Sequence, residues 1–294
     1  MKISIILITY NQENYINQAI ESVLMQRFDG EVEVIIADDS SSDKTLSIIE
    51  SFESTTQFKF KYLKQESNLG YTKNYKRAFV ACDGDYIAIM EGDDYWIDPY
   101  RLQKHVDFLD NHRECVMSMN RFIQFVESES FYFHSYWEES DKYKYVTSQM
   151  MAVKNNLGNL SACVFRTSEL KKINQNIFDL KAGVTDWILG MSLGLYGYIV
   201  IFKDIMSVYR VHNNGEWSKM DENEKKQTVL REIEEYNQYL GYKYDKEFKY
   251  HLQLLQQPNK KNLVESITQF VPPIIFTFIK LLMPPVFRTW MKGK

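Results

Sequence analysis

Short apolar segments alternate with longer amphipathic ones over the first 90 residues, and this alternation restricts the fold more than any other feature of the chain. The first segment, residues 3–8, is apolar apart from Ser4 and rich in isoleucine, as expected of a central strand that is buried on both faces. Similar segments predict three further strands, at residues 32–37, 58–63 and 85–90. Because the intervening segments have helical spacing, we expect an α/β fold with a mostly parallel, Rossmann-like sheet flanked by helices.

The expected elements continue less regularly beyond residue 99. Helices are predicted where apolar residues recur three and four positions apart, at residues 16–24, 42–52, 72–81, 101–111, 186–196 and 221–255. Further strands are predicted at residues 115–126, 199–202 and 207–211. The last helical segments are polar and charged, so we expect a helical C-terminal extension.

Charge and cysteine content exclude several classes of protein. The formal net charge is −4 at pH 7, so no basic surface for nucleic acid is expected. Cys82, Cys115 and Cys163 are far apart without paired spacing, which argues against a disulfide framework and a cysteine-rich zinc site. The N-terminal apolar run is too short for a signal peptide or a membrane span, and we expect a cytoplasmic protein.

Polar and acidic residues follow three of the predicted strands. They are Thr9, Tyr10 and Asn11 after the first strand, Asp38 and Asp39 after the second, and Glu91, Gly92, Asp93 and Asp94 after the fourth. Ligands of open parallel sheets bind beyond the carboxyl ends of the strands, so these residues are expected to face one ligand. The sequence contains neither a G-x-G-x-x-G pattern after the first strand nor a P-loop. Carboxylates approach phosphates through a divalent cation, and the acidic strand ends therefore predict a metal ion and a phosphate-bearing ligand.

The two acidic segments differ in how strongly they indicate a site. Asp38 and Asp39 begin an Asp-Asp-Ser-Ser-Ser-Asp sequence that is equally suited to a solvated turn before a helix. The Glu91-Gly92-Asp93-Asp94 cluster places three carboxylates after an apolar strand, where they repel one another unless a cation or donor is present. This cluster is the stronger indication of function.

Four motifs in the first 100 residues resemble, in order and spacing, those of glycosyltransferase family 2. They are Ile8-Thr9-Tyr10-Asn11, Ala37-Asp38-Asp39-Ser40-Ser41-Ser42-Asp43, Asn68-Leu69-Gly70, and the sequence GDYIAIMEGDDYW that begins at Gly84. A less specific similarity continues through Thr185-Asp186-Trp187 and Tyr209-Arg210-Val211-His212, so that the resemblance covers roughly residues 1–215. It implies a GT-A fold and an inverting enzyme that moves a sugar from a nucleotide-diphosphate donor, with a UDP-sugar expected, to a hydroxyl.

The resemblance also implies roles for residues of the donor site. Thr9 and Asp39 match the family's contacts to the nucleotide base and ribose, while Tyr10 and Asn11 shape the same pocket. Asp93 matches the metal ligand of the family's DXD motif, which implies a divalent metal, Mn²⁺ or Mg²⁺, as cofactor.

The remaining matches concern the reacting end of the donor. Glu91 departs from the family pattern because it stands where the first Asp of the DXD motif is usual, and its longer side chain favours a ribose hydroxyl or a metal-bound water. Asp186 matches the catalytic base, and a helix N-cap before Trp187 is the alternative from the residues alone. Arg210 matches a segment that closes over the diphosphate, and His212 is a candidate additional metal ligand.

These expectations divide the chain into three regions: a nucleotide-sugar-binding half at residues 1–100, an acceptor-binding and catalytic half at 101–215, and a helical region at 216–294. Three other functions have less support. A degenerate nucleotide-sugar-binding or assembly protein is compatible with Glu91. A G-x-S-x-G pattern at residues 190–194 is typical of serine hydrolases, but it lies within a predicted helix. A sugar-nucleotide pyrophosphorylase would need a glycine-rich segment after the first strand.

The C-terminal segment, residues 266–294, combines an apolar stretch with basic residues and contains no acidic residue. This composition favours a helix that lies in the interface of an anionic membrane, and a helix buried against the domain or in a homodimer is the alternative. Together with the resemblance to glycosyltransferase family 2, which implies a bacterial enzyme of cell-surface polysaccharide synthesis, we expect peripheral association with the inner face of the membrane. Its acceptor would be a glycan or a lipid-linked acceptor.

Overall fold

The structure is a computed structural model that describes residues 1–52, 57–129, 131–133 and 142–256. Contacts within the chain group Met1–Leu252 into one compact unit. The segment 266–294, for which we expect a membrane contact, lies outside the described residues. In the part of the chain that is described, no helix has both the length and the apolar character needed to cross a bilayer.

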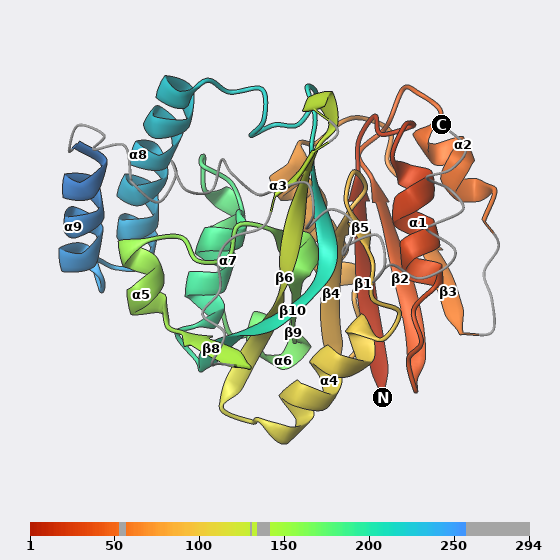
Figure 1. The fold of residues 1–294 in the computed structure, drawn as a ribbon, viewed down its shortest axis with the longest axis horizontal. Coiled ribbons are helices and arrows are strands. Elements are labelled where there is room, and N and C mark those ends of the chain that lie inside the picture. Colours follow the sequence, from red (N-terminus) through yellow and green to blue (C-terminus); the bar gives the residue numbers. More distant parts are fainter. Residues whose placement is uncertain (53–56, 130, 134–141, 257–294) are drawn as a thin grey trace, which may run out of the picture. The chain divides into compact units, whose positions relative to one another are not determined.

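Ten strands of the described residues form one mixed sheet in the order β3-β2-β1-β4-β9-β6-β10-β5, with β7 beside β6 and β8 beside β10 (Figure 1). The strands are β1 Lys2–Thr9, β2 Glu31–Asp38, β3 Phe58–Tyr62, β4 Tyr86–Glu91, β5 Tyr95–Trp96, β6 Cys115–Val126, β7 Phe131–Phe133, β8 Tyr143–Val146, β9 Cys163–Arg166 and β10 Tyr198–Val211. Strands β1 to β4 are parallel to one another, and β6 is parallel to β10. The predicted α/β fold with a mainly parallel sheet is confirmed, and β9 joins its two parts by antiparallel pairing.

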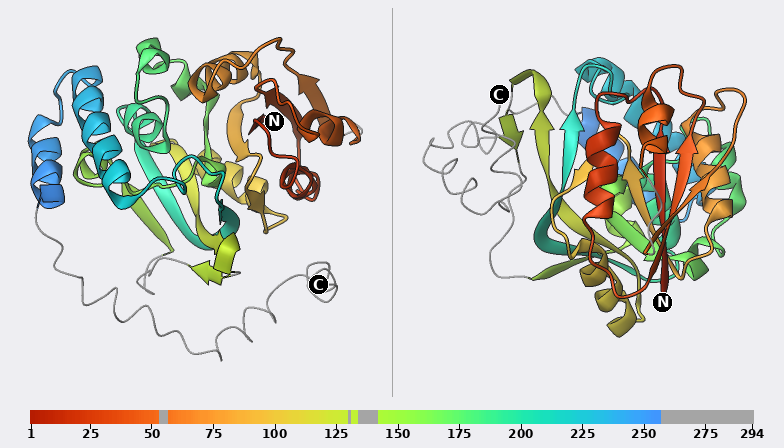
Figure 2. Two further views of the ribbon diagram at one scale, coloured as in Figure 1. Left: turned by 90° about the horizontal axis from the view of Figure 1, so that it is seen from above. Right: turned by 90° about the vertical axis from the view of Figure 1, so that its right-hand side faces the viewer.

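Helices cover both faces of this sheet. They are α1 Ile16–Leu24, α2 Thr45–Glu50, α3 Tyr71–Ala81, α4 Arg101–Asn111, α5 Ser148–Val153, α6 Thr167–Leu170, α7 Asp186–Leu193, α8 Glu222–Tyr239 and α9 Asp245–Gln256, with 3₁₀ turns η1 Glu127–Glu129, η2 Leu160–Ala162 and η3 Gln175–Asp179. Helices α1 and α3 lie on opposite faces of strands β1 and β2 (Figure 2). Right-handed crossovers require this arrangement, because the chain moves outward from β1 to β3 and then returns to β4.

Two sequence interpretations concern the second half of the sheet. The strands predicted at 199–202 and 207–211 are wrong as separate elements, because one strand, β10, spans both. Its pairing with β6 shifts register between Phe202 and Ser207, which interrupts the apolar pattern without ending the strand. The prediction that the G-x-S-x-G sequence lies in a helix is confirmed by α7, where the hydroxyl of buried Ser192 donates to the carbonyl of Ile188 at 2.6 Å.

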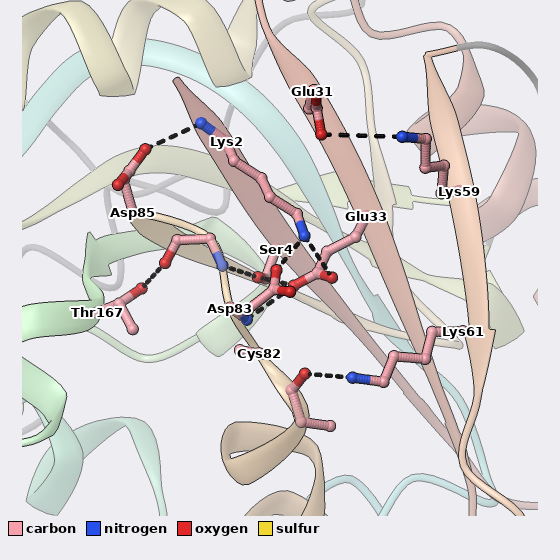
Figure 3. A network of polar contacts seen from close by, with 12 residues as sticks. Lys2, Ser4, Glu31, Glu33, Lys59, Lys61, Cys82, Asp83, Asp85 and Thr167 are labelled. Carbon is pink, nitrogen blue, oxygen red and sulfur yellow. Dashed lines mark hydrogen bonds and ion pairs between the residues drawn. The ribbon is translucent and has the colours of Figure 1, made fainter.

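A polar network fixes the amino ends of β1, β2 and β4 (Figure 3). Glu33 of β2 is buried and accepts hydrogen bonds from the Ser4 hydroxyl and from the Asp83 amide, the latter at 2.9 Å. Lys2 pairs with the same carboxylate at 3.0 Å. Gly84 belongs to this close approach, since a Cβ there would lie 2.6 Å from the Ser4 amide nitrogen. These contacts hold the three strands in register, so that their carboxyl ends meet at the other edge of the sheet.

Candidate active site

The acidic strand ends come together because of the parallel register. Thr9 at the end of β1 pairs with Asp38 of β2, and Ile8 pairs with Glu91 of β4. A tight turn follows Glu91, in which the Asp94 amide donates to the Glu91 carbonyl at 2.9 Å. The residues predicted at these three strand ends therefore do face one edge of the sheet.

Strand β5 brings the distant part of the chain to the same place. Its two residues, Tyr95 and Trp96, pair with Val208 and Ser207 of β10. The antiparallel pairing places the residues that precede β5 beside the end of β10. In this way Asp93 and Asp94 meet Arg210 and His212, more than 100 residues later in the sequence.

Asp93 and His212 are hydrogen-bonded to each other. His212 Nε2 lies 3.0 Å from Asp93 Oδ2, and the imidazole is 6% exposed. The ring also packs on Tyr15, with 4.5 Å between ring centroids. Among the described residues, His212 Nδ1 is buried and has no hydrogen-bond partner.

A divalent metal fits this pair as a partial ligand set. The described residues contain no group of three or more His, Cys, Asp or Glu side chains arranged to hold a metal ion. A carboxylate oxygen and an imidazole nitrogen that converge within 3.0 Å, with the Asp93 side chain 22% exposed, can supply two ligands. Mg²⁺ and Mn²⁺ commonly take their other ligands from phosphate oxygens and water, so two protein ligands are sufficient for a metal that arrives with a diphosphate.

Asp94 stabilises the arrangement of Asp93 and His212. Its buried carboxylate accepts hydrogen bonds from the Arg210 amide at 2.9 Å and from Asn159 Nδ2 at 2.8 Å. Burial, followed by the charge of Asp93, raises the pKa of Asp94 to about 7. Both of its oxygens are occupied by protein donors, so Asp94 joins β10 to the acidic turn.

Glu91 lies next to this group. Its carboxylate accepts a hydrogen bond from the Tyr75 hydroxyl at 3.2 Å, and its amide donates to the Ser161 hydroxyl at 3.0 Å. Burial, then the charges of Asp94 and Asp93, raise the pKa of Glu91 well above its ordinary value. The predicted contact with a ribose hydroxyl or a metal-bound water agrees with this environment and remains a prediction.

The Arg210 side chain donates hydrogen bonds to groups of the protein itself. Its Nε donates to the Asp93 carbonyl at 2.9 Å, and an Nη donates to Gln18 Oε1 at 2.6 Å. The guanidinium lies over the rings of Tyr15 and Tyr95, at 4.9 and 5.3 Å from their centroids. With 8% of the residue exposed, Arg210 adds a buried positive charge behind the carboxylates. Its predicted contact with a diphosphate remains a prediction.

The loops after β1 and β2 are tied to each other. The hydroxyl of buried Thr9 donates to Gln12 Oε1 at 2.7 Å. Asn11 has a positive φ of 51°, and its side-chain oxygen accepts from the Ser42 amide at 2.8 Å. Tyr10 is 48% exposed and is free to meet a ligand at this edge.

Asp38 and Asp39 have different roles in the second loop. Asp38 accepts from the Ser41 amide at 2.9 Å, which agrees with the turn interpretation. Asp39 faces away from that turn and accepts from the amides of Leu69 and Gly70 at 3.0 and 2.9 Å. Both acids are buried, so the turn is not solvated at these positions. Asp39 therefore joins the second loop to the Asn68-Leu69-Gly70 motif.

Asp186 is the first residue of α7, and the N-cap of this helix is Thr185, whose side chain accepts from the Ile188 amide. Asp186 Oδ2 accepts hydrogen bonds from Asn155 Nδ2 at 2.9 Å and from the Gly158 amide. Burial raises the pKa of Asp186. Its charge is also a minor cause of the raised pKa of Glu91.

The sequence motifs do not reveal several residues that complete the site. Gln12 and Tyr15 contact Thr9 and His212, and Asn155 and Asn159 hold Asp186 and Asp94. Gln12 and Tyr15 lie between the Ile8-Thr9-Tyr10-Asn11 motif and the helix predicted at 16–24, and this proximity is the signal that could have indicated them. The two asparagines lie in a loop whose path depends on tertiary contacts.

Known proteins resemble this chain in both sequence and fold. The sequence profile described as Glycosyl transferase family 2 matches residues 4–172. The uncharacterized protein Rv1520 of Mycobacterium tuberculosis is 32% identical over 217 residues, which are 73% of this chain and 60% of that protein. The chain thus spans 60% of the length of this relative. The poly(ribitol-phosphate) β-N-acetylglucosaminyltransferase TarS of Staphylococcus aureus is 34% identical over 118 residues, 40% of this chain and 20% of TarS.

Solved structures share the fold at lower identity. The structure of S. aureus TarS 1–349 with UDP-GlcNAc has a TM-score of 0.59 and 20% identity, and covers 90% of this chain and 78% of that one. The mannosyltransferase PcManGT of Pyrobaculum calidifontis, with GDP-Man and Mn²⁺, has a TM-score of 0.56 and 14% identity, and covers 99% and 83%. These likenesses confirm the GT-A fold. The profile match, which covers more than half of the chain, shows that the chain belongs to glycosyltransferase family 2.

Proposed function

We propose that the chain is an inverting, metal-dependent glycosyltransferase that moves a sugar from a nucleotide-diphosphate donor to a hydroxyl of a glycan or lipid-linked acceptor. The observation that carries the proposal is the Asp93–His212 pair, 3.0 Å apart at the carboxyl edge of the parallel strands. The charge of Asp186 is one of the causes that raise the pKa of Glu91, which precedes Asp93 by two residues. A metal-binding pair and a separate carboxylate are the groups that this reaction requires.

The donor is proposed to bind along the ends of β1 and β2. Tyr10 is exposed there, and Thr9, Asn11 and Asp39 fix the two loops that would surround the base and ribose. Solved structures of similar proteins contain UDP-GlcNAc in TarS and GDP-Man with Mn²⁺ in PcManGT. The sequence similarity to TarS favours a UDP-sugar.

Asp93 and His212 would hold the divalent ion, Mn²⁺ or Mg²⁺, through Oδ2 and Nε2. When bound, the ion supplies positive charge that offsets the negative charge gained by the departing diphosphate. Asp94 and Arg210 keep the pair in place by joining the acidic turn to β10. Glu91 would contact a ribose hydroxyl or a metal-bound water.

Asp186 is proposed as the base that accepts the proton of the attacking hydroxyl. Attack on the anomeric carbon from the side opposite the diphosphate inverts the configuration of that carbon. Burial raises the pKa of Asp186, and a base with a pKa nearer the working pH is a better proton acceptor. The hydrogen bonds from Asn155 and Gly158 hold Oδ2, and they would orient the carboxylate toward the acceptor hydroxyl.

The cellular setting is proposed from the sequence. A basic apolar segment at 266–294 would hold the enzyme at the cytoplasmic face of the membrane, where lipid-linked acceptors of cell-surface polysaccharides are located. Deletion of residues 266–294 is expected to abolish sedimentation with phosphatidylglycerol vesicles. Unchanged sedimentation of the shortened protein would refute the membrane role.

The decisive experiment is a panel of UDP-, GDP- and dTDP-sugars, assayed for release of the nucleoside diphosphate with Mn²⁺, Mg²⁺ or EDTA. We expect hydrolysis of one donor that requires the metal and is lost in Asp93→Ala. Asp29→Ala, which changes an acid remote from the carboxyl edge of the sheet, is the control. Donor binding without turnover would favour the degenerate alternative, and an Asp93→Ala protein as active as the parent would contradict the metal role.

A further inference from the structure

The segment of residues 181–185 leads directly into Asp186 and determines where α7 begins. It contains no helix or strand, and Gly183 within it has a positive φ of 80°. Neither this segment nor α7 is part of the region that matches the family profile, which ends at residue 172. The contacts that position Asp186 therefore involve a segment outside the matched region.

Helix α8 holds this segment through a carboxylate. The two oxygens of Glu235 accept hydrogen bonds from the amides of Lys181 and Ala182, at 2.7 and 2.6 Å. One acid thus binds two successive backbone amides that have no partner in regular secondary structure. Hydrogen bonds to an ionised acceptor are about twice as strong as neutral ones.

Tyr236, the next residue of α8, holds the end of the segment. Its hydroxyl lies 3.0 Å from Thr185 Oγ1, the N-cap of α7, and 3.4 Å from the Gly183 carbonyl. Tyr236 is fully buried and meets the ring of Trp187 edge-on, with 5.7 Å between centroids. These contacts fix both the backbone before Asp186 and the first turn of its helix.

The start of α3 holds the same segment from the other side. The Tyr71 hydroxyl donates to the Ala182 carbonyl at 2.9 Å, and Thr72 Oγ1 accepts from the Val184 amide at 3.3 Å. The approach is close, because a Cβ on Gly183 would lie 1.8 Å from the Tyr71 hydroxyl oxygen. Helix α7 accordingly lies between α8 and α3 in Figures 1 and 2.

The α3 contacts also connect the segment to the donor loops. Tyr71 directly follows Gly70, whose amide donates to Asp39 at 2.9 Å. Asp39 is the residue that joins the second loop to this motif. Two hydrogen bonds, joined by the peptide bond between Gly70 and Tyr71, therefore link Asp39 to the segment before Asp186.

We propose that Glu235 and Tyr71 are positioning residues for Asp186, which act through residues 181–185 and align the base with the donor site. The inference rests on the proposed function, because it takes Asp186 as the base. Glu235 fixes two amides of the segment, and Tyr71 makes the position of the segment depend on the donor loops. Neither residue contacts the reacting atoms, so both affect the rate of transfer rather than binding of the metal.

The test compares Glu235→Gln with Glu234→Gln, a matched change of the adjacent, exposed acid of α8. Glutamine keeps one acceptor oxygen and turns an NH₂ group toward the second amide. Tyr71→Phe removes only the hydroxyl, and Tyr62→Phe on the edge strand is its control. Each protein is assayed for release of nucleoside diphosphate from the donor that the parent hydrolyses fastest in the panel.

We expect Glu235→Gln and Tyr71→Phe to lower kcat about tenfold or more, since small displacements of a reacting group are costly, while the donor KM changes less than about twofold. Amide hydrogen exchange should become faster in peptides covering residues 181–188 of Glu235→Gln. The controls should match the parent in both measurements. A purely structural role would lower the melting temperature and leave kcat of the folded protein unchanged, which would overturn the proposal.

Asp186→Asn separates this result from the proposed function. If the parent hydrolyses a donor and Asp186→Asn does not, normal kcat in Glu235→Gln and Tyr71→Phe refutes the positioning role alone. If Asp186→Asn is as active as the parent, or the parent hydrolyses no donor, the proposed function fails and the positioning role falls with it.

Discussion

His212 Nε2 lies 3.0 Å from Asp93 Oδ2, although 119 positions separate the two residues in the sequence. The pairing of β5 with β10 creates this contact, and Asp94 reinforces it by binding the Arg210 amide. A carboxylate and an imidazole that already face each other need little rearrangement to receive a cation between or beside them.

Replacement of His212 by alanine is the first test of this relationship. It removes one of the two proposed ligands, so we expect the Mn²⁺ concentration for half-maximal donor hydrolysis to rise about tenfold or more, within the range reported for lost metal-site residues. His112→Ala, a change of a half-exposed histidine paired with Glu114, is the control. An unchanged metal requirement in His212→Ala would show that the imidazole is not a metal ligand.

Gly92 provides a test of the donor loops. A Cβ at this position would lie 2.3 Å from Gln12 Oε1 and 2.9 Å from Thr9 Oγ1. Gly92→Ala should therefore displace the loop after β1 and raise the donor KM about tenfold, the effect of losing roughly 1.4 kcal/mol of binding free energy.

The close approach to Gln12 provides a control for the Gly92→Ala prediction. Gln12→Ala removes the nearer of the two clashing atoms, so the double variant Gln12→Ala/Gly92→Ala should recover part of the donor affinity lost in Gly92→Ala. If the two substitutions simply add, the loop after β1 is not the cause of the defect.

The sequence predicts most of the first half of the fold because local and tertiary preferences agree there. The segment at residues 3–8 becomes β1, and the helix predicted at 101–111 is α4 with the same bounds. The second half is less regular: β10 continues through a change of register where the apolar pattern breaks. A hydrophobic pattern alone cannot distinguish such an irregularity from a loop.

The candidate site is predictable in its residues but not in its contacts. The motifs indicate Asp93 and His212, and the structure brings them together. The same motifs indicate Arg210 without revealing that its guanidinium is buried against aromatic rings. Glu235 belongs to no sequence motif. A carboxylate that binds backbone amides can be recognised only once the path of the chain is known.

The pH dependence of turnover should report on Asp186. The base must be ionised to accept a proton, so kcat is expected to fall as the pH is lowered through the pKa of Asp186. Burial raises this pKa. The fall of kcat on the acid side of the pH profile, its acid limb, should therefore occur above pH 3.8, the pKa of an ordinary aspartate.

Asn155→Ala sharpens this test. In the parent, the Asn155 side chain donates to Asp186 and stabilises the ionised carboxylate. Loss of this hydrogen bond should move the acid limb to higher pH. Asn111→Ala, at an exposed asparagine of α4, should leave the limb in place. An acid limb that is identical in Asn155→Ala and the parent would assign it to another group.

Glu232 of α8 gives a prediction about stability rather than activity. Burial, followed by the charge of Asp186, raises the pKa of Glu232 from 4.5 to about 7 in the folded protein. Below pH 4.5 both the folded and the unfolded chain keep the proton, and the raised pKa has no cost. Between pH 4.5 and 7 the unfolded chain releases the proton more readily than the folded one, so this group lowers the free energy of unfolding as the pH rises.

Glu232→Gln removes this titration while keeping an oxygen near the Tyr236 hydroxyl, which lies 3.4 Å from Glu232 Oε1. We therefore expect the variant to gain stability relative to the parent as the pH rises from 5 to 8, by an amount on the order of 2 kcal/mol. Urea unfolding at the two pH values measures the difference, and Glu234→Gln at the exposed neighbouring position should show no such trend. A difference between Glu232→Gln and the parent that is the same at both pH values would mean that Glu232 ionises normally in the folded protein.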